Sequence, residues 1–336
     1  MLNITIVPLV LCYLVVCIIL MCLCRFYWTR RKLYVASYNY DGPLAFPIIG
    51  NALSFIGHND KILMKLYHIV ESYQPIPMRF WLGPVLALVF SSPDHAEKIL
   101  SSSKFAHKHD LYKFLQIFIG NGLISGSGSN HKLHRRIIQP MVNLNFVLVH
   151  LDIVHKHINE CISSLNDFVG KGTFNILEHV HKCFRDIIKE LIFGVEAKSQ
   201  LDGENKFDQV IVEFYDIIFS RLMKVHLQID FIFNMTSLKK KQTKYRDLIR
   251  NLVRQFIKEA QEKKKLKLNG SSFNPIINQM NEFLEENPGF FDEDTFIDHI
   301  LTLYLAAEDT ITVISAFLLL CLGMNLEYQV MVSKLL

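Results

Sequence analysis

Two acids and a threonine, Glu308-Asp309-Thr310, interrupt a long apolar run that extends from Ile300 to Met324. Carboxylates inside an apolar helix are costly unless they are paired or used for function. Acids at such a position are therefore candidates for a functional site. The alternative interpretation is structural, with a buried carboxylate that caps a loop.

Cysteine and histidine offer little for metal binding. Two histidine pairs, His155 with His157 and His179 with His181, are spaced by two residues and therefore do not share a helix face. Four of the seven cysteines lie in the first apolar run, and no Cys-x-x-Cys pair occurs. The other three are too widely spaced for a disulfide framework and indicate a reducing compartment; they are Cys161, Cys183 and Cys321.

The segment that must position Glu308 and Asp309 runs from Asp292 to Met324 and opens with three acids, which favour a helix N-terminus. A second membrane span is one interpretation of this segment. Its apolar residues contribute roughly −4 to −7 kcal/mol to insertion, and the two central acids cost about +5 to +7 kcal/mol. Because the balance is near zero, a long helix through the core of a globular domain fits better.

The first apolar run differs because no charge opposes it. Residues 2–24 hold no charged side chain, and at ~1.5 Å per residue they can span a ~30 Å hydrocarbon core. A cleavable signal peptide, the alternative, expects basic residues before the run. Here they follow it, as Arg25, Arg30, Arg31 and Lys32. We predict a membrane anchor with the body in the cytosol, in agreement with the thiol usage.

The rest of the chain indicates a mainly helical body. Half of the 336 residues are hydrophobic, which excludes a disordered protein, and a net charge of +4 is too small to indicate a nucleic-acid partner. Prolines and glycines predict a hinge over Asp41–Asn51, and two short runs around Gly83-Pro84 predict a hairpin of Met78–Trp81 with Val85–Phe90. Apolar periodicity predicts helices over 57–73, 144–169, 176–193, 207–225 and 244–264.

Several segments, in this order, resemble a microsomal cytochrome P-450, a haem-thiolate monooxygenase of the insect and vertebrate fatty-acid-hydroxylase-like clan. The first are the anchor, the hinge with Gly50-Asn51, the loop Gly120-Asn121-Gly122-Leu123, and His134-Arg135-Arg136 with Pro140. Ala306-Ala307-Glu308-Asp309-Thr310 stands where the family has Ala/Gly-Gly-x-Asp/Glu-Thr-Thr/Ser in its I helix. The resemblance implies a mainly α fold with a small β element, truncated after the I and J helices and preceded by one transmembrane helix.

The resemblance also implies that the I helix crosses one face of a haem cofactor. Thr310 would be the hydroxyl that relays protons to dioxygen, Asp309 its acid neighbour, and Ala307 the small residue beside the oxygen. Two residues depart from the family pattern. Ala307 replaces the usual glycine, and Ile311 replaces the usual second threonine or serine, which removes one hydroxyl from the relay.

A second haem contact is implied on the family's C helix, where Trp-x-x-x-Arg holds a haem propionate. His131 stands in place of the tryptophan, and Arg135 in place of the arginine. Arg135 can donate to a carboxylate in a forked geometry, and His131 can donate one hydrogen bond. An exposed helix arginine is the alternative interpretation of Arg135.

The family's remaining haem motifs follow the I helix. No glutamate of this chain is followed by arginine three residues on, and Cys321-Leu322-Gly323 lies in a continuous apolar run. We therefore expect no metal ligand within the chain, with the family's cysteine thiolate beyond Leu336. On this interpretation the residues are a fragment that is inactive alone. A degenerate, haem-free and membrane-tethered helical binding protein is the alternative.

The expected organisation has three parts: an anchor at 1–24, a basic stretch with the hinge at 25–51, and a partial cytochrome P-450 domain at 52–336. The resemblance implies the endoplasmic reticulum membrane and an NADPH-cytochrome reductase as partners. A lipophilic small-molecule substrate is also implied, because the apolar segments 105–118 and 226–238 resemble substrate-contacting regions of the family.

Overall fold

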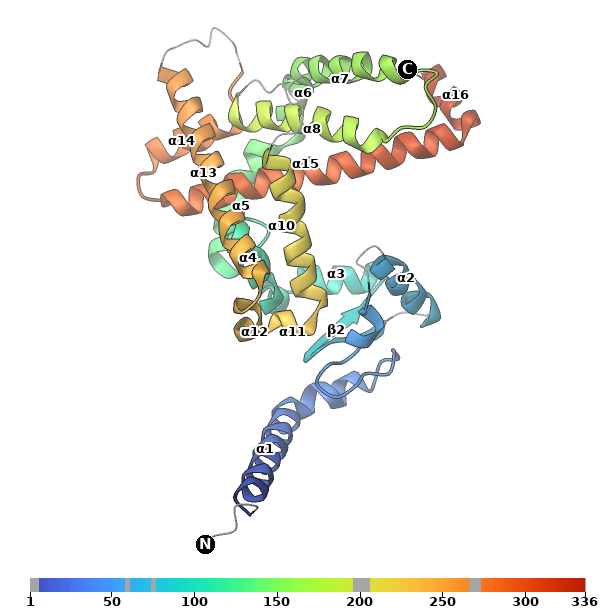
Figure 1. Cartoon of the computed structure of the whole chain (residues 1–336). Coiled ribbons are helices and arrows are strands. Elements are labelled where there is room, and N and C mark those ends of the chain that lie inside the picture. Colours follow the sequence, from blue (N-terminus) through green and yellow to red (C-terminus); the bar gives the residue numbers. More distant parts are fainter. Residues whose placement is uncertain (1–5, 58–60, 74–76, 196–205, 266–272, 336) are drawn as a thin grey trace. The chain divides into compact units, whose positions relative to one another are not determined.

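The structure of the protein is a computed structural model that describes all residues except 1–5, 58–60, 74–76, 196–205, 266–272 and 336. The chain divides into two compact units, Met1–Ser103 with Met223–Ile229 and Lys104–Leu222 with Asp230–Leu336. Helices dominate both units, and the described residues form one two-stranded sheet (Figure 1). The expectation of a mainly α fold with a small β element is confirmed.

The elements of the first unit are α1 (Ile6–Ser37), α2 (Ile62–Ser72), β1 (Met78–Leu82), β2 (Val85–Val89), α3 (Pro93–Ser101) and α11 (Val225–Gln228). Apart from the last residue of α10, the elements of the second unit are α4 (Lys113–Ile119), α5 (Gly128–Ile138), α6 (Leu144–Val149), α7 (Leu151–Leu165), α8 (Ile176–Phe193), α10 (Lys206–Met223), α12 (Asp230–Asn234), α13 (Ser237–Lys265), α14 (Ile276–Glu286), α15 (Glu293–Met324) and α16 (Leu326–Leu335). Short 3₁₀ helices occupy Ala52–Phe55, Ser103–Phe105, Asp110–Tyr112, Gln139–Val142 and Asn166–Phe168.

Helix α1 carries the first apolar run and continues through the basic residues that follow it. Its length and composition suffice to cross a membrane, with a mean hydropathy of 2.8 in its most apolar window and none of that window buried. Most of its large apolar side chains between Leu9 and Met21 are exposed, as they would be toward lipid. These properties fit the predicted anchor, whose residues 2–5 lie outside the described part of the chain.

Asn51 fixes the hinge to the hairpin. Its Nδ2 donates to the carbonyl of Leu44 at 2.9 Å, and its Oδ1 accepts from the backbone N–H of Trp81 at 2.8 Å. Gly50 approaches the strand so closely that a Cβ would lie 2.4 Å from the Trp81 carbonyl oxygen, and its φ of +58° favours glycine. The pair Gly50-Asn51 therefore determines the path of the hinge.

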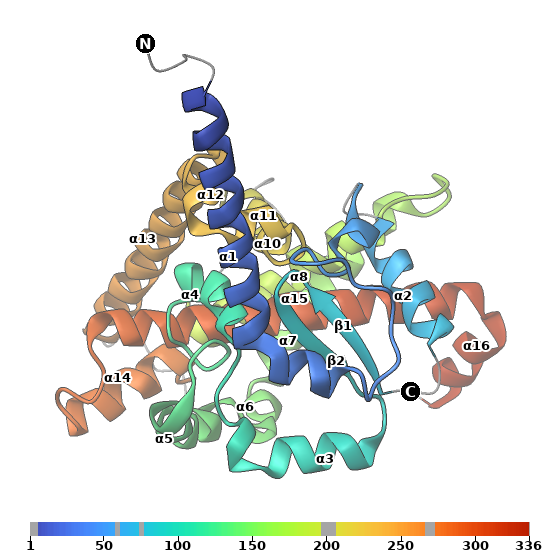
Figure 2. The same ribbon diagram turned by 90° about the horizontal axis from the view of Figure 1, so that it is seen from below.

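Helix α15 is the central helix of the second unit. It lies beside α8 in both ribbon views and also contacts α13 and α4 (Figures 1 and 2). Its N-terminal half is buried, and Ile297, Ile300 and Leu301 have no exposed surface. Asp292 caps the helix, because its Oδ1 accepts a hydrogen bond from the N–H of Thr295 at 2.7 Å. The acidic start predicted from the sequence is thus the helix start.

Several predicted elements are confirmed, and one is wrong. The hairpin forms with Met78 opposite Val89, and the helix expected over 176–193 is α8. The helix expected over 144–169 is broken at His150, where the helical segments before and after it meet at 65°. His150 is buried, with its ring centroid 4.9 Å from that of Phe146 and 4.8 Å from that of Phe273. At this turn the His150 ring packs against both phenylalanines.

By length and composition α15 is a second candidate membrane span, and the bent helical pair that meets at His150 is a third. The two halves of α15 differ. The first packs inside its unit, whereas the second exposes large apolar side chains such as Ile314 (68%) and Phe317 (62%). The buried N-terminal half and the contact with α8 favour the core-helix interpretation.

Candidate functional site

An apolar cavity of about 440 Å³ lies against α15 in the second unit, and we call it the α15 cavity. The residues of α15 that line it are Thr302, Leu303, Ala306, Ala307 and Ile311. Its other walls come from α8, from the helical turns between Val142 and Val147, from Ile276 of α14, and from the loop residues Leu123 and Ile124. The small side chains of Ala306 and Ala307 keep this side of the helix open.

One polar atom of the cavity wall has no hydrogen-bond partner. Thr302 is 2% exposed, and among the described residues nothing bonds to its Oγ1. Gly122 packs directly against it, because a Cβ on Gly122 would lie 2.0 Å from that oxygen. The loop before α5 therefore packs on the cavity-lining Thr302 through a glycine, at a position where a side chain would not fit.

Of the three predicted residues on α15, Ala307 lines the cavity, whereas Asp309 and Thr310 are not among its lining residues and have different surroundings. Thr310 is exposed, and its Oγ1 donates to the carbonyl of Ala306 at 2.7 Å. Asp309 is partly buried, and burial raises the pKa of its carboxyl, as does the charge of Glu308, while His181 acts in the opposite direction. Burial, with Asp309 and Glu308 nearby, also raises the pKa of Tyr215 on α10. Asp309 therefore faces a low-dielectric region that favours its protonated form.

Glu308 is one of the two acids noted in the sequence, where no role was assigned to it. The structure shows its partner. It is 2% exposed, and its Oε1 lies 3.0 Å from Nε2 of His181 on α8. The contact joins the two central helices at the turn that carries Asp309 and Thr310. Glu308 is therefore a buried carboxylate that pairs two helices, and none of the described contacts shows it capping a loop.

The two C-helix candidates lie on α5 and take part in a cluster of three basic side chains, Lys108, His131 and Arg135, which we call the cation cluster. Nζ of Lys108 donates to the carbonyl of Leu123 at 3.1 Å and also to that of Ile124. Nε2 of His131 lies 2.9 Å from the same Leu123 carbonyl oxygen. The cluster therefore holds the two loop residues that line the α15 cavity.

The members of the cation cluster affect one another electrostatically. Burial lowers the pKa of Lys108, and the charge of Arg135 lowers it further. Burial also lowers the pKa of His131, as do Lys108 and Arg135, against the opposing effect of the Leu123 carbonyl. Arg135 is exposed, with its Nε 3.3 Å from Oε1 of Gln139. The positive charge gathered in the cation cluster favours binding of an anionic group.

Lys108 was not among the candidate site residues predicted from the sequence. It is one of three lysines between Ser103 and Phe114, and neither spacing nor composition distinguishes it from Lys104 and Lys113. Its position depends on the loop that runs from Gly120 into α5, including a hydrogen bond of 2.9 Å from its backbone N–H to Oγ of Ser127. Only the folded loop shows that it belongs with His131 and Arg135.

Cysteine and histidine form no metal site within the described residues, where no group of three or more potential ligands gathers. Cys161 and Cys183 are buried between α7 and α8, and Cys321 is exposed on the continuous helix α15. His299 approaches His134 at 3.0 Å between Nε2 and Nδ1, but both rings lie among phenylalanines. Each of these side chains has a structural environment.

Comparison with known families gives the class of protein. The sequence profile described as "Cytochrome P450" matches residues 41–334. The match covers most of the chain, and its start lies within the hinge. The chain therefore belongs to the cytochrome P450 family, and the resemblance noted in the sequence is confirmed.

Curated relatives from insects and vertebrates agree with this assignment. The chain is 28% identical to cytochrome P450 4V2 of Mus musculus over 55% of its own length and 36% of that protein. It is 25% identical to cytochrome P450 4c21 of Blattella germanica (86% and 59%) and 26% identical to the probable cytochrome P450 4aa1 of Drosophila melanogaster (90% and 59%). The chain thus spans between about a third and three fifths of the length of these relatives.

Proposed function

We propose that this chain contributes one half of the haem site of a membrane-bound monooxygenase. The whole enzyme would insert one atom of dioxygen into a C–H bond of a lipophilic substrate. The other oxygen atom would leave as water, with two electrons from NADPH delivered by a reductase and two protons. The observation that carries the proposal is the α15 cavity, which has apolar walls and is bordered by the loop that the cation cluster holds.

The residues present fit a haem group. An apolar cavity of about 440 Å³ beside small side chains suits a flat, largely apolar ring system. Among the described residues that line it, the one buried side-chain polar atom without a hydrogen-bond partner is Oγ1 of Thr302. At the loop, the positive charge of the cation cluster favours binding of the haem carboxylates. Haem bound there would supply the iron that activates dioxygen.

Within the cation cluster, we assign Arg135 and Lys108 to the haem propionates. Arg135 is exposed with a forked donor set, and the Lys108 ammonium lies beside the two loop carbonyls that border the cavity. The role of His131 as a propionate donor stays a prediction. A neutral imidazole has one N–H, and Nε2 faces the Leu123 carbonyl, so His131 would chiefly position the loop.

On α15, Ala307 would leave room beside the helix, and Asp309 with Thr310, on the turn between the lining residues Ala307 and Ile311, would hold and move a proton. The Thr310 hydroxyl donates to the Ala306 carbonyl and can accept a hydrogen bond at the same time. Asp309 supports the role of an acid because burial raises its pKa and keeps a proton on the carboxyl more readily. Both residues precede Ile311, whose apolar side chain also lines the cavity.

We further propose that the thiolate ligand belongs to a segment beyond Leu336 of a longer protein. The match to 59% of two insect relatives supports this, as does the exposed apolar surface on the second half of α15. The proposed domain limits are 1–24 for the anchor, 25–51 for the basic stretch with the hinge, and 52–336 for the part of the catalytic domain. Without the thiolate, the 336 residues would be catalytically inactive.

For the anchor we propose the endoplasmic reticulum membrane, with the body on the cytosolic side. The apolar stretch of α1 and the four basic residues after it support this orientation. A cytosolic body would meet an NADPH-cytochrome reductase, which the family implies as the electron donor.

The alternative function is a haem-free, membrane-tethered binding protein. An in-frame Glu-x-x-Arg and Cys-x-Gly in transcripts downstream of Leu336 would support the enzyme, and an immediate stop codon in all of them would support the alternative.

The experiment that tests the enzymatic proposal is Thr310→Ala in the protein extended through its thiolate segment. The quantity measured is hydrogen peroxide released per NADPH consumed, together with product formed. We expect the ratio of peroxide released to NADPH consumed to rise, because the variant lacks the hydroxyl that would pass on the proton. Thr310→Ser keeps the hydroxyl and is the matched control. An unchanged ratio with full product formation would leave Thr310 as an ordinary helix residue.

A further inference from the structure

We propose that a second cavity, formed in the first unit where α1 meets the hinge, binds the phosphate headgroup of an anionic phospholipid. This hinge cavity has a volume of about 490 Å³ and lies far along the chain from the residues of the α15 cavity. The inference rests on one part of the proposed function, namely that α1 is inserted in a membrane. It does not depend on haem or on the thiolate segment.

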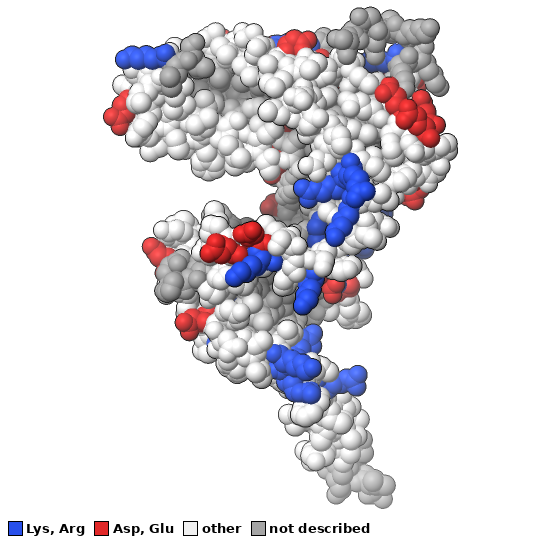
Figure 3. Space-filling view, turned by 180° about the vertical axis from the view of Figure 1, so that it is seen from behind, with Lys and Arg blue, Asp and Glu red and all other residues white. Residues whose placement is uncertain are grey.

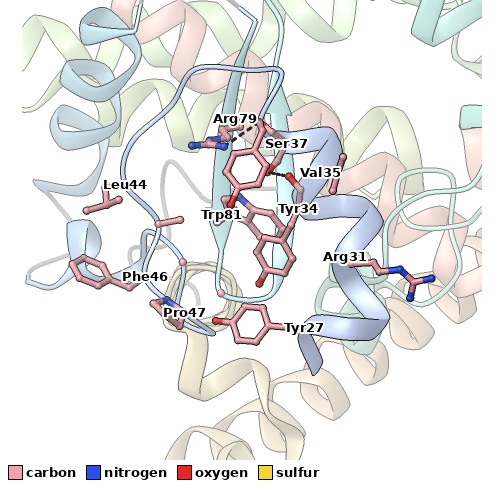
Figure 4. A pocket seen from close by; sticks show the side chains of 14 residues that line it. Tyr27, Arg31, Tyr34, Val35, Ser37, Leu44, Phe46, Pro47, Arg79 and Trp81 are labelled. Carbon is pink, nitrogen blue, oxygen red and sulfur yellow. Dashed lines mark hydrogen bonds between the residues drawn. The ribbon is translucent and has the colours of Figure 1, made fainter. Parts of the chain in front are cut away.

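The walls of the hinge cavity are aromatic and held in place. The rings of Tyr34 and Trp81 are stacked, with centroids 4.7 Å apart and planes at 17° (Figure 4). The hinge residues Phe46 and Pro47 face them, with Tyr27 of α1 beside Pro47 (Figure 4). Backbone hydrogen bonds of 2.9 and 2.8 Å between Phe46 and Gly50 close the hinge loop, so the cavity is built before any ligand arrives.

Arg79 gives the cavity its charge. One guanidinium nitrogen, Nη1, donates to the carbonyl of Ser37 at 3.1 Å, as the dashed line in Figure 4 shows. Its Nε is buried and has no hydrogen-bond partner among the described residues. The described residues form no ion pair with Arg79 either. A guanidinium with an unused donor beside a cavity is a site for an anion that can accept more than one hydrogen bond.

The cavity has a second arginine and no acid. Arg31 lines it from α1, with its guanidinium extending away from the stacked rings (Figure 4). None of the described residues that line the cavity is acidic. Lys and Arg also gather where the white apolar stretch of α1 ends (Figure 3). Charge complementarity therefore selects an anionic occupant over a neutral or cationic one.

The position of the hinge cavity along the chain indicates that a lipid is the source of that anion. The cavity includes Tyr27, which is three residues after the end of the uncharged run at Cys24. At ~1.5 Å per residue, Tyr27 lies only about 5 Å along the helix from the end of that run, at the depth of lipid headgroups. Tyrosine and tryptophan favour this interfacial region. The cytosolic leaflet, where the basic residues place the body, carries the anionic phospholipids.

The experiment uses the full chain in phosphatidylcholine vesicles and reads the fluorescence of Trp81. The chain has two tryptophans, Trp28 and Trp81, so Trp28→Phe leaves the cavity residue as the only tryptophan, which is excited selectively at the red edge of the absorption band. Phosphatidylserine or phosphatidylcholine with a spin label near the headgroup is added in increasing mole fraction as a quencher. We expect saturable quenching, with half-quenching by phosphatidylserine at about a tenfold lower mole fraction than by phosphatidylcholine.

Matched variants separate the cavity from general attraction of a basic helix to an anionic surface. Arg79→Gln should remove the tenfold preference, and Arg79→Lys should keep part of it. Arg30→Gln removes the same charge from a residue that does not line the cavity, and it should keep the preference. Arg31→Gln is an exposed change that removes a hydrogen bond to the Trp28 carbonyl and a contact with the Trp28 ring, both within α1, so it reports on the cavity even where Arg79→Gln unfolds the hinge. It should lower the preference.

Each other outcome overturns the inference. Equal quenching by the two lipids would show that the cavity does not select an anion. Equal loss of preference in Arg79→Gln, Arg31→Gln and Arg30→Gln would reduce the effect to surface charge. Competition by soluble glycerophosphoserine at the same concentration as the lipid would make the ligand a free phosphate ester. Quenching by neither lipid would contradict membrane insertion of α1, and so would overturn the anchor as well.

Discussion

The backbone N–H of Asn121 lies 2.8 Å from Oδ2 of Asp298, across 177 residues of sequence. The other carboxylate oxygen of Asp298 accepts from Nη1 of Arg250 on α13 at 2.7 Å. One carboxylate thus joins α15, α13 and the loop that borders the α15 cavity. This arrangement fixes the loop on which the cation cluster acts, and the predictions below test how far the site depends on it.

Gly120 has to be glycine if the loop packs on Asp298 as described. A Cβ there would lie 1.9 Å from the Asp298 carboxyl, and φ is +59°. Gly170 is the matched control, because its φ is +75° but nothing lies within 4 Å of the point that a Cβ would occupy. We expect Gly170→Ala to lower the free energy of unfolding by about 1 kcal/mol, and Gly120→Ala by about 1–3 kcal/mol more. Denaturant unfolding of the full chain in detergent measures both, and equal effects would contradict the close packing.

The pair of His181 and Glu308 should stabilise the contact of α8 with α15. His181→Ala leaves a carboxylate that is 2% exposed without that partner, and we expect a loss of about 2 kcal/mol in the free energy of unfolding. The exposed His155→Ala on α7 is the control and should change little. In a Glu308→Gln background, His181→Ala should cost less, because no charge is left unpaired. The same cost in both backgrounds would show that the pair does not matter.

His299 should make stability depend on pH on the acid side. Burial, with His134 and His131 nearby, lowers the pKa of His299 to about 4 in the folded protein, against about 6.5 in the unfolded chain. Between these values the unfolded chain binds more protons than the folded protein. The contribution of His299 to stability is therefore fully present above about pH 6.5 and is lost as the pH falls toward 4. The loss amounts to about 3 kcal/mol. Unfolding measured from pH 4 to 7 should show this slope, and His299→Phe should flatten it; an unchanged slope would assign it to other groups.

The helices could be predicted from the sequence because each signal is local. Asp292 and the apolar residues after it lie within one helix, and so do the apolar positions of α8, whose limits agree with the prediction. Gly83-Pro84 likewise predicts the turn of the hairpin from adjacent residues. Periodicity records which face of an element is buried, and this is enough to locate the element.

The site was only partly predictable because its contacts join distant residues. The break at His150 depends on Phe273, and the placement of Lys108 depends on a loop that folds back onto it. Nothing in the local pattern distinguishes Lys108 from its neighbouring lysines. The family resemblance identified Arg135, His131, Ala307, Asp309 and Thr310 as candidates, and the structure adds that Ala307 alone of these five lines the cavity. Their catalytic roles remain predictions.

The central claim is that the α15 cavity and the cation cluster form half of a haem site. Haem added to the full chain in detergent should bind saturably, as followed by the Soret band, and without a thiolate-type band after reduction and carbon monoxide. Lys108→Ala with Arg135→Ala should weaken binding about tenfold, since two solvent-accessible ion pairs to the propionates, worth about 0.2–1 kcal/mol each, are lost. Lys132→Ala with Arg136→Ala removes the same charge from α5 residues outside the cation cluster and should leave binding unchanged. Equal weakening by both double variants, or no saturable binding at all, would contradict the account.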